Sequence, residues 1–305
     1  MKYLKHLVPV VIAIALITIV ISFETAKSHG QSQTAKTQGV KSIVPSSEVT
    51  AKAMDKASPN VSPAAARNSI LENELTWTFG GKQQRGWYLY NLLIGQSLNT
   101  QSEPASNDFA TAVATWQNKA GLKASGVLDE DTLLPMISEW QRNRLKDRTP
   151  AQPDQLMTAP TSDFYDPQRL PELRQVERNT YAAYKQMIAA AIADPTLNLN
   201  HTSNDALAPA EKYLKIVSAF RSREYQDQLR RQSPNAGSAG LAVNSPHFTG
   251  RALDLYVGGD PVDTKDSNRG IQVKTPVYEW LVRNAGRFGF RPYFYEPWHW
   301  EYVRN

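Results

Sequence analysis

The segment 245–257 constrains this chain more than any other part of the sequence. After Gly250, large apolar residues alternate with other side chains, a pattern typical of a β-strand with two different faces. Leu253 and its aliphatic neighbours lie on one face, and Asp254 lies on the other. Gly250 permits a sharp bend, so that His247 can return over the face of Asp254. The pattern therefore predicts a strand that presents a histidine and a carboxylate together.

A second constraint is the short segment Glu296-Pro297-Trp298-His299 near the C-terminus. A continuous strand would direct Glu296 and His299 to opposite faces, because side chains alternate along a strand. Pro297 disfavours such a strand and favours a tight turn, in which residues three apart point the same way. We therefore expect a turn here, with Glu296 and His299 facing one site and Trp298 and Trp300 as its walls.

These side chains form a donor set for a metal ion. Two imidazoles and one carboxylate can hold Zn²⁺ and leave a fourth position open for water, as catalytic zinc sites do. The second carboxylate, Glu296, would then be free to carry a proton. The alternative is that His299 is an ordinary half-buried histidine and that the spacing of His247 and Asp254 is coincidental.

Three motifs together resemble the zinc D-alanyl-D-alanine carboxypeptidases of the VanY type, metallopeptidases that trim the peptides of bacterial cell walls. The motifs are S-x-H-x-x-G-x-A-x-D from Ser245, E-P-W-H from Glu296, and S-A-F-R-S at 218–222 with Gln226 after it. The resemblance covers about the last third of the chain, and its specificity comes from the order and spacing of all three motifs. It implies a zinc ion with three ligands and one catalytic base: His247, Asp254 and His299 as ligands, Glu296 as base.

The same resemblance implies a role for Arg221 in catalysis, through contact with the substrate. Arg221 stands at the end of a strand expected over 213–220, where a guanidinium is well placed for a carboxylate or a developing oxyanion. The alternative is a surface ion pair with Glu224 or Asp227. Three further residues are implied to contact the substrate: Ser245, Gln226 and Trp298.

The composition limits the classes of partner. A formal net charge of +5 is small for 305 residues, and no basic run alternates with aromatic residues, so we expect no nucleic-acid partner. Cysteine is absent, which excludes disulfides and thiolate metal ligands. We expect a monomer whose partners are peptidoglycan and its stem peptides, and a membrane contacted through the N-terminal helix.

The N-terminal region predicts export. Residues 1–23 contain lysines followed by an apolar run, which is typical of a signal anchor or a signal peptide. The rest of the chain would then lie on the extracytoplasmic face of a bacterial cell membrane, in the periplasm or cell wall, either membrane-anchored or secreted. Residues 24–67 contain no aromatic residue and are rich in small and polar side chains, which predicts a disordered linker.

Residues 68–145 predict a small all-α domain of three helices. The motif from Phe109 to Gln117, with Gly126 and Asp129 after it, resembles the peptidoglycan-binding module often attached to wall hydrolases. Asp129 is expected to cap a helix that starts near residue 130. The alternative is that these residues only fill the core of a helical domain with another role.

The remaining residues predict a linker and a catalytic domain. Repeated prolines indicate a second linker over 146–171. Residues 172–305 are expected to form an α+β domain with an antiparallel sheet and packed helices, the latter over 172–193 and 275–288. The predicted reaction is zinc-dependent hydrolysis of the terminal D-Ala-D-Ala bond of stem peptides. Two alternatives remain open: an endopeptidase that cuts within the stem peptide or cross-link, and a non-catalytic, zinc-stabilised wall-binding protein.

Overall fold

The computed structural model describes residues 61–232 and 243–303. The predicted N-terminal membrane helix, residues 1–23, lies outside the described residues, as does most of the predicted linker. In the described part of the chain, no helix is both long and apolar enough to cross a membrane. By its contacts, Ala57–Asn305 is one compact unit.

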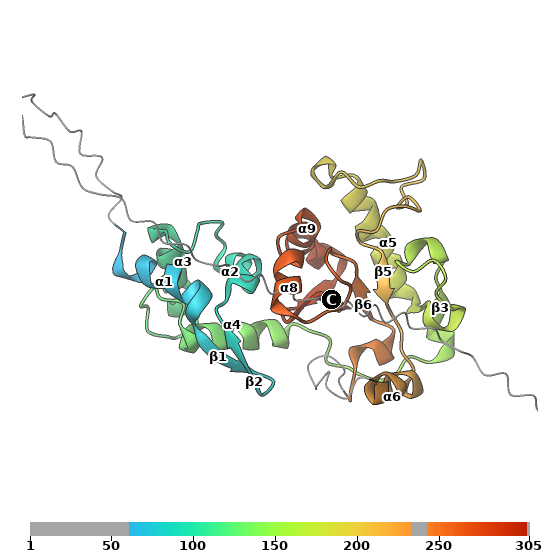
Figure 1. Cartoon of the computed structure of the whole chain (residues 1–305), viewed down its shortest axis with the longest axis horizontal. Helices are drawn as coiled ribbons and strands as arrows, with labels where there is room; N and C mark the ends of the chain where they lie inside the picture. Colours follow the sequence, from blue (N-terminus) through green and yellow to red (C-terminus); the bar gives the residue numbers. More distant parts are fainter. Residues whose placement is uncertain (1–60, 233–242, 304–305) are drawn as a thin grey trace, which may run out of the picture. The chain divides into compact units, whose positions relative to one another are not determined.

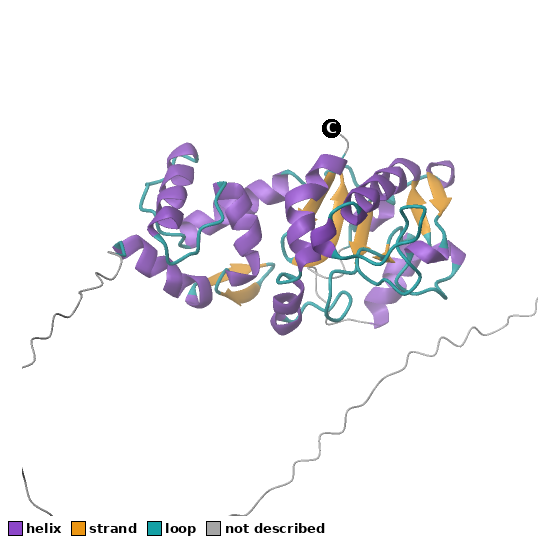
Figure 2. Ribbon diagram, turned by 90° about the horizontal axis from the view of Figure 1, so that it is seen from above, coloured by secondary structure: helices purple, strands orange, loops and turns teal. Residues whose placement is uncertain are grey.

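The N-terminal part of this unit contains helices and one β-hairpin. Its elements are α1 (Pro63–Glu74), β1 (Thr76–Phe79), β2 (Lys82–Arg85), η1 (Tyr88–Tyr90), α2 (Asn91–Leu98), α3 (Asn107–Lys119) and α4 (Glu130–Arg142). β1 and β2 pair antiparallel, and Figure 2 shows this hairpin apart from the larger sheet. The predicted helices are present as α2, α3 and α4, but the prediction of an all-α domain over 68–145 was wrong, because this hairpin and the end of α1 also lie there. Gly80 and Gly81 both have positive φ, and they close a two-residue hairpin turn that helical spacing alone does not reveal.

The motif from Phe109 to Gln117, with Gly126 and Asp129 after it, serves the fold. Gln117 is 1% exposed, and its amide donates to the Val127 carbonyl and the Thr132 hydroxyl while its oxygen accepts from the Gly126 N–H. Asp129 caps α4, as predicted, because its carboxylate accepts from the backbone N–H of Thr132.

A four-stranded antiparallel sheet organises the C-terminal part, as predicted. Its strands are β5 (Ile216–Ser218), β6 (Ala252–Leu255), β7 (Phe290–Tyr293) and β8 (Glu296–Tyr302), in the spatial order β5-β6-β8-β7. The central strands β6 and β8 are buried along almost their whole length. A side chain on the inner part of this sheet is therefore removed from water and held by strands on both sides.

Within the residues that the structure describes, four helices accompany the sheet: α5 (Arg178–Ile192), α6 (Arg223–Gln232), α8 (Asp266–Gln272) and α9 (Pro276–Asn284). Of these, α8 contacts the central strand β8, and Figure 1 shows α5 next to β5. Tyr278 of α9 packs edge-on against Trp300 of β8, with ring centroids 6.4 Å apart. The 3-10 turn η8 (Ala285–Phe288) continues α9, so the helix expected over 275–288 is confirmed.

The helix expected over 172–193 begins later than predicted. η4 (Pro171–Leu173) and β4 (Gln175–Glu177) precede α5, and β4 pairs with β3 (Leu156–Thr158). Glu177 ends the strand and caps α5 through its carboxylate. The first predicted helical residues are therefore extended, because pairing with β3 outweighs their helical spacing.

The segment predicted as a second linker is packed onto the four-stranded sheet. It contains β3 and the 3-10 turns η2 (Pro153–Gln155) and η3 (Thr161–Asp163), so its prolines do exclude long helices and strands. Phe164 is 1% exposed and bridges to Ile216 of the edge strand β5.

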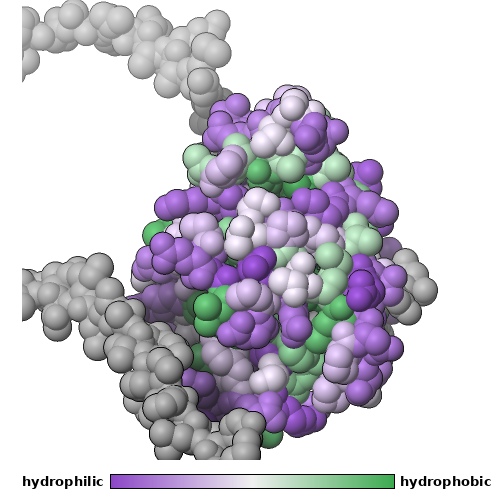
Figure 3. All heavy atoms as spheres, turned by 90° about the vertical axis from the view of Figure 1, so that its right-hand side faces the viewer, coloured by the Kyte–Doolittle hydropathy of each residue, from purple (hydrophilic) through white to green (hydrophobic). Residues whose placement is uncertain are grey.

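The helical part and the sheet part share one buried core. Arg269 of α8 is 1% exposed and donates to the hydroxyl of Tyr90, and Gln96 of α2 donates to the Val282 carbonyl of α9. Buried apolar side chains of both parts belong to one hydrophobic cluster. On the face seen in Figure 3, hydrophilic residues separate small apolar groups.

Candidate metal centre

Asp254 lies at the centre of a buried cluster on β6. Its Oδ1 is 2.8 Å from Nδ1 of His299 and 3.3 Å from Nε2 of His247, and its Oδ2 accepts from Nη2 of Arg221 at 2.7 Å. Asp254 pairs directly with His299 in the ladder between β6 and β8. The structure therefore brings together the three predicted ligands and places Arg221 against the same carboxylate.

His247 reaches this cluster from a short local turn. It lies in the 3-10 helix η7 (Pro246–Thr249), which Ser245 caps and Gly250 ends with φ of 65°. The ring Nδ1 lies 2.6 Å from the backbone carbonyl of Ala219. Since a carbonyl only accepts, Nδ1 must carry the proton and Nε2 is the nitrogen that faces Asp254. The bend predicted at Gly250 is confirmed.

His299 and Glu296 come together differently from the prediction. The expected tight turn is wrong, because both residues belong to the strand β8. The ladder between β7 and β8 is irregular: Pro292 pairs with Trp300, but the next residue, Tyr293, pairs with Glu296. Such a bulge breaks the alternation of side chains. It brings the Glu296 carboxylate within 4.0 Å of Nδ1 of His299.

The walls predicted for the site are not formed by Trp300. That side chain lies on the other face of β8, where its ring packs against Tyr278 and its N–H donates to the Pro297 carbonyl. Tyr293 takes the place beside the imidazole, with its ring centroid 6.0 Å from that of His299. Trp298 is 3% exposed, and its substrate contact stays a prediction.

Glu301 was missed in the sequence. Its side chain is fully buried, and its Oε1 lies 3.3 Å from Nε2 of His299. Arg144 and Arg148 form ion pairs with this carboxylate, and the backbone N–H of Leu145 donates to it. The signal available was the spacing of two from His299, which places both side chains on one face of a strand.

Burial and charge shift the two carboxyl groups of the cluster in opposite directions. Burial alone raises the pKa of Asp254, but His247, His299 and Arg221 outweigh it, so that the pKa lies well below its usual value. Burial raises the pKa of Glu296 to about 7; His299 opposes this shift and Asp254 adds to it. One carboxyl group is thus fixed as an anion, and the other can exchange a proton near neutral pH.

The two imidazoles also differ. Burial, assisted by Arg221, lowers the pKa of His247 to about 4. Burial alone would lower the pKa of His299, but hydrogen bonds to Asp254 and Glu301 outweigh it and raise that pKa to about 9. His247 is therefore neutral at pH 7, whereas His299 holds a proton that a metal ion would have to displace.

The donor set fits a divalent metal. One ligand atom each from His247, Asp254 and His299 lie within 4.8 Å of one another, and all three residues are buried. The second nitrogen of each imidazole has its own acceptor, the Ala219 carbonyl or the Glu301 carboxylate. Such outer partners fix the tautomer and the ring direction of metal-binding histidines.

The other residues predicted to contact the substrate are held by the protein. Nε of Arg221 donates to Ser218 and its Nη1 lies 3.4 Å from Oε1 of Gln226, so the predicted alternative of a surface ion pair is not seen. Gln226 is 1% exposed. Ser245 is also buried, and its hydroxyl accepts from the N–H of His247.

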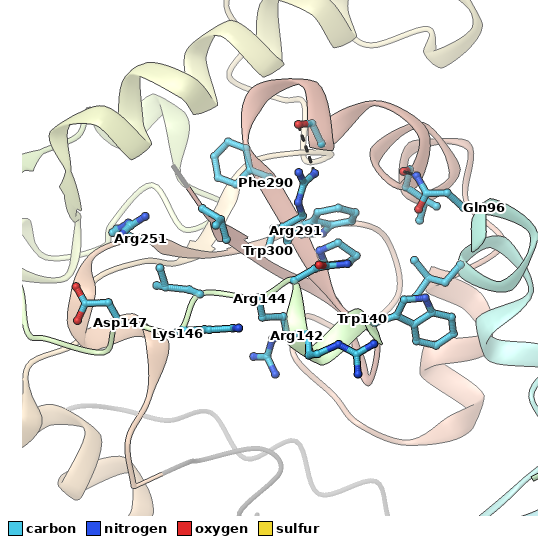
Figure 4. Close-up of a pocket in the computed structure, with 17 residues that line it drawn as sticks. Gln96, Trp140, Arg142, Arg144, Lys146, Asp147, Arg251, Phe290, Arg291 and Trp300 are labelled. Carbon is cyan, nitrogen blue, oxygen red and sulfur yellow. Dashed lines mark hydrogen bonds between the residues drawn. The ribbon is translucent and has the colours of Figure 1, made fainter. Parts of the chain in front are cut away.

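A pocket of about 660 Å³ lies next to this cluster without containing it. Its lining includes several cationic side chains, seen in Figure 4: Arg142, Arg144, Lys146, Arg251 and Arg291. None of its lining residues belongs to the predicted metal ligands. Arg144 connects the two places, because it lines the pocket and pairs with Glu301.

The fold and the cluster together define an α+β domain with a candidate metal centre, in which a free carboxylate stands beside the ligands as in metal-dependent hydrolases. Residues 174–305 match the family model VanY, described as D-alanyl-D-alanine carboxypeptidase. A search of curated proteins gave no match. A solved structure of the LdcB LD-carboxypeptidase, described as revealing the molecular basis of peptidoglycan recognition, is similar at 22% identity and a TM-score of 0.34. The matched region covers 52% of this chain and 71% of the LdcB chain.

Proposed function

We propose that this chain is a zinc-dependent carboxypeptidase that removes the last residue from the D-Ala-D-Ala end of peptidoglycan stem peptides. The observation that carries the proposal is the buried group of His247, Asp254 and His299 with Glu296 beside it. The match of residues 174–305 to the VanY family model supports the substrate class. A free carboxylate next to the ligands favours an enzyme over a protein that uses zinc only for stability.

Glu296 is the proposed base and acid. A zinc ion held by His247, Asp254 and His299 would supply Lewis-acid chemistry, polarising the scissile carbonyl and making water more acidic. Glu296 accepts a proton as water attacks and then delivers it to the leaving amine. Its pKa of about 7 suits both steps, because proton transfer is most efficient when the carrier titrates near the working pH.

Arg221 has two proposed tasks. Its Nη2 holds Oδ2 of Asp254, which leaves Oδ1 directed at the two imidazoles. Its Nη1, at 3.4 Å from Gln226, makes only a long contact and can turn to an anionic group of the substrate. The substrate contacts of Ser245, Gln226 and Trp298 are proposed on the family resemblance.

The test is incubation of purified protein and zinc with pentapeptide muropeptides, followed by mass spectrometry. Loss of a single alanine, abolished by a chelator and in Glu296→Gln, is the expected result. Cleavage inside the stem peptide, or opening of cross-links without release of alanine, would favour the endopeptidase. Absence of any cleavage by zinc-loaded protein would favour a binding protein.

We further propose that residues 68–145 bind peptidoglycan. The support is the motif resemblance around Phe109 to Gln117. The check is co-sedimentation of the Glu296→Gln protein with insoluble peptidoglycan at low salt, with and without an excess of soluble stem peptide to occupy the catalytic site. Protein that stays in the supernatant when stem peptide is present would show that this part has another role.

Export is also a proposal. The apolar run in residues 1–23 supports a position on the extracytoplasmic face of the membrane, anchored or secreted. Cell fractionation of the full chain and of a chain lacking residues 1–23 tests it. Recovery of both in the same compartment would contradict the proposal.

A further inference from the structure

Glu301 is the most completely paired carboxylate near the candidate metal centre. Arg144 Nη2 lies 2.5 Å from its Oε1 and Arg148 Nη1 lies 3.2 Å from the same atom, while the Leu145 N–H donates to Oε2 at 2.8 Å. Its remaining contact is Nε2 of His299 at 3.3 Å. Burying a carboxylate is unfavourable unless charges and hydrogen bonds offset the loss of water. Three donors from one short segment do so here.

The position of Glu301 decides which nitrogen of His299 can bind a metal. Nδ1 faces Oδ1 of Asp254 at 2.8 Å, in the cluster with His247, whereas Nε2 faces Glu301. A carboxylate can only accept, so Nε2 keeps its proton when His299 becomes a neutral ligand. Nδ1 is then the nitrogen with a free lone pair, directed into the cluster.

We propose that Glu301 is a positioning residue for the metal ligand His299, and that the segment Arg144–Arg148 is an integral part of the metal centre. This inference rests on the proposed function, since it assumes that the cluster holds zinc. It goes beyond the family match, because Arg144–Arg148 precedes the matched residues 174–305 and follows directly on the last helix of the N-terminal part.

Arg144 is itself held in place from several directions. Its guanidinium stacks 3.9 Å from the centroid of the Tyr293 ring and donates to the Gln141 side chain. The same Tyr293 ring packs against His299. Figure 4 shows Arg144 in the lining of the cationic pocket, so this support for the metal centre can be reached from solvent. The end of α4 is therefore connected to the imidazole through two contacts, the carboxylate of Glu301 and the ring of Tyr293.

The alternative is that Glu301 merely ties α4 to the sheet. The two roles differ in what they change: a tie affects stability alone, whereas a positioning residue changes the metal site in protein that is still folded. Outer carboxylate partners of metal-binding histidines typically change metal affinity about 10- to 100-fold when they are replaced.

The experiment compares Glu301→Gln with Glu279→Gln in the full chain. Glu279 is a matched control, because it forms an ion pair with Arg283 on α9 and takes no part in the cluster. The zinc dissociation constant is measured by competition with a chromophoric chelator, and Co²⁺ substituted for zinc reports ligand geometry through its visible absorption. We expect Glu301→Gln to raise the dissociation constant by about 10- to 100-fold and to alter the Co²⁺ spectrum. Glu279→Gln should change neither.

Two further variants keep the test decisive if Glu301→Gln does not fold. Arg148, which is 20% exposed in its side chain, can be replaced by Gln, and Arg144 by Lys. Both should weaken zinc binding less than Glu301→Gln and in the same direction. Unchanged zinc affinity and an unchanged Co²⁺ spectrum in the folded variants would overturn the inference while leaving the proposed function intact. A wild-type chain that binds no zinc would overturn both.

Discussion

The two histidines of the candidate metal centre are held by opposite means. His247 depends on a local device: a capped 3-10 turn ended by Gly250, and the backbone carbonyl of Ala219. His299 depends on two carboxylates from distant parts of the chain, Asp254 and Glu301. The pKa is about 4 for the first imidazole and about 9 for the second.

Because their pKa values differ, the two imidazoles differ in whether they can bind a metal directly at neutral pH. A neutral imidazole can bind a metal at once, whereas a protonated imidazole must first lose its proton. His247 is therefore ready at neutral pH, and His299 becomes a ligand only when the metal displaces its proton. Metal binding should release protons, and His299 should be their main source.

The largest loss of activity is expected from replacing Glu296, whose carboxylate lies near His299 but is not a proposed metal ligand. Glu296→Gln removes the proton carrier, so kcat should fall by about 100- to 10,000-fold, the range for loss of a general base. Zinc content, measured by mass spectrometry of native protein, should remain equal to that of wild type. His299→Gln is the comparison, since it should lose both zinc and activity. Loss of zinc in Glu296→Gln would show that Glu296 is a ligand after all.

A smaller effect, on stability and zinc affinity, is expected from changing the 3-10 turn that holds His247. Gly250→Ala forces an alanine into φ of 65° and places its Cβ 2.8 Å from the Leu156 side chain and 2.9 Å from the backbone nitrogen of Glu177. Strain of this kind costs about 1–3 kcal/mol, and the close contacts add to it. Denaturant unfolding should show this loss, together with weaker zinc binding.

Gly121→Ala is the control for Gly250→Ala. Its φ is 72°, but a Cβ there would meet no atom within 4 Å, so only the backbone strain remains. We expect a smaller loss of stability and no change in zinc affinity. Equal losses in the two variants would mean that the packing around Gly250 does not hold the turn of His247.

The contrast between the local turn that holds His247 and the long-range contacts that hold His299 explains which features could be predicted from the sequence. The strand after Gly250 and its placement of Asp254 follow from local alternation and a bend, which short-range patterns capture. The geometry of Glu296 and His299 does not, because it comes from a bulge against β7 that depends on pairing between strands. Glu301 was missed for a related reason. Its partners are Arg144 and Arg148, which lie more than a hundred residues earlier, where the predicted helical domain 68–145 meets the predicted linker 146–171.

The pH dependence of stability should separate the two histidines in metal-free protein. His299 has a folded pKa raised from 6.5 to about 9, so its contribution is complete below pH 6.5 and is lost as the pH rises through 9. His247 has a folded pKa lowered to about 4, so stability is lost as the pH falls from 6.5 toward 4. Chelator-treated protein should therefore show a falling unfolding midpoint from pH 6.5 to 9.

Variants test which histidine causes the loss of stability above pH 6.5, the alkaline limb of the stability profile, and which causes the loss below pH 6.5, the acidic limb. His299→Gln should flatten the alkaline limb, and His247→Gln should reduce the acidic limb and leave the alkaline one unchanged. Saturating zinc should also flatten the alkaline limb, because Nδ1 then carries a metal in place of a proton. An alkaline limb that persists in His299→Gln would contradict the assignment.

The smallest expected effect concerns Ser245, for which two roles compete. Its hydroxyl accepts from the His247 N–H at 3.3 Å and caps the 3-10 turn, and loss of such a cap costs about 1 kcal/mol. Ser245→Ala should lower the free energy of unfolding by about this amount. Ser106→Ala, which removes the cap of α3, should cost a similar amount but leave kcat, KM and zinc affinity unchanged.

If Ser245 only holds His247, kcat and zinc affinity fall slightly and KM for a D-Ala-D-Ala peptide stays the same. If the family resemblance is right that Ser245 contacts the substrate, KM rises in Ser245→Ala alone. Steady-state kinetics of the two variants at saturating zinc distinguishes these outcomes, because both lose a similar cap and only one lies at the cluster.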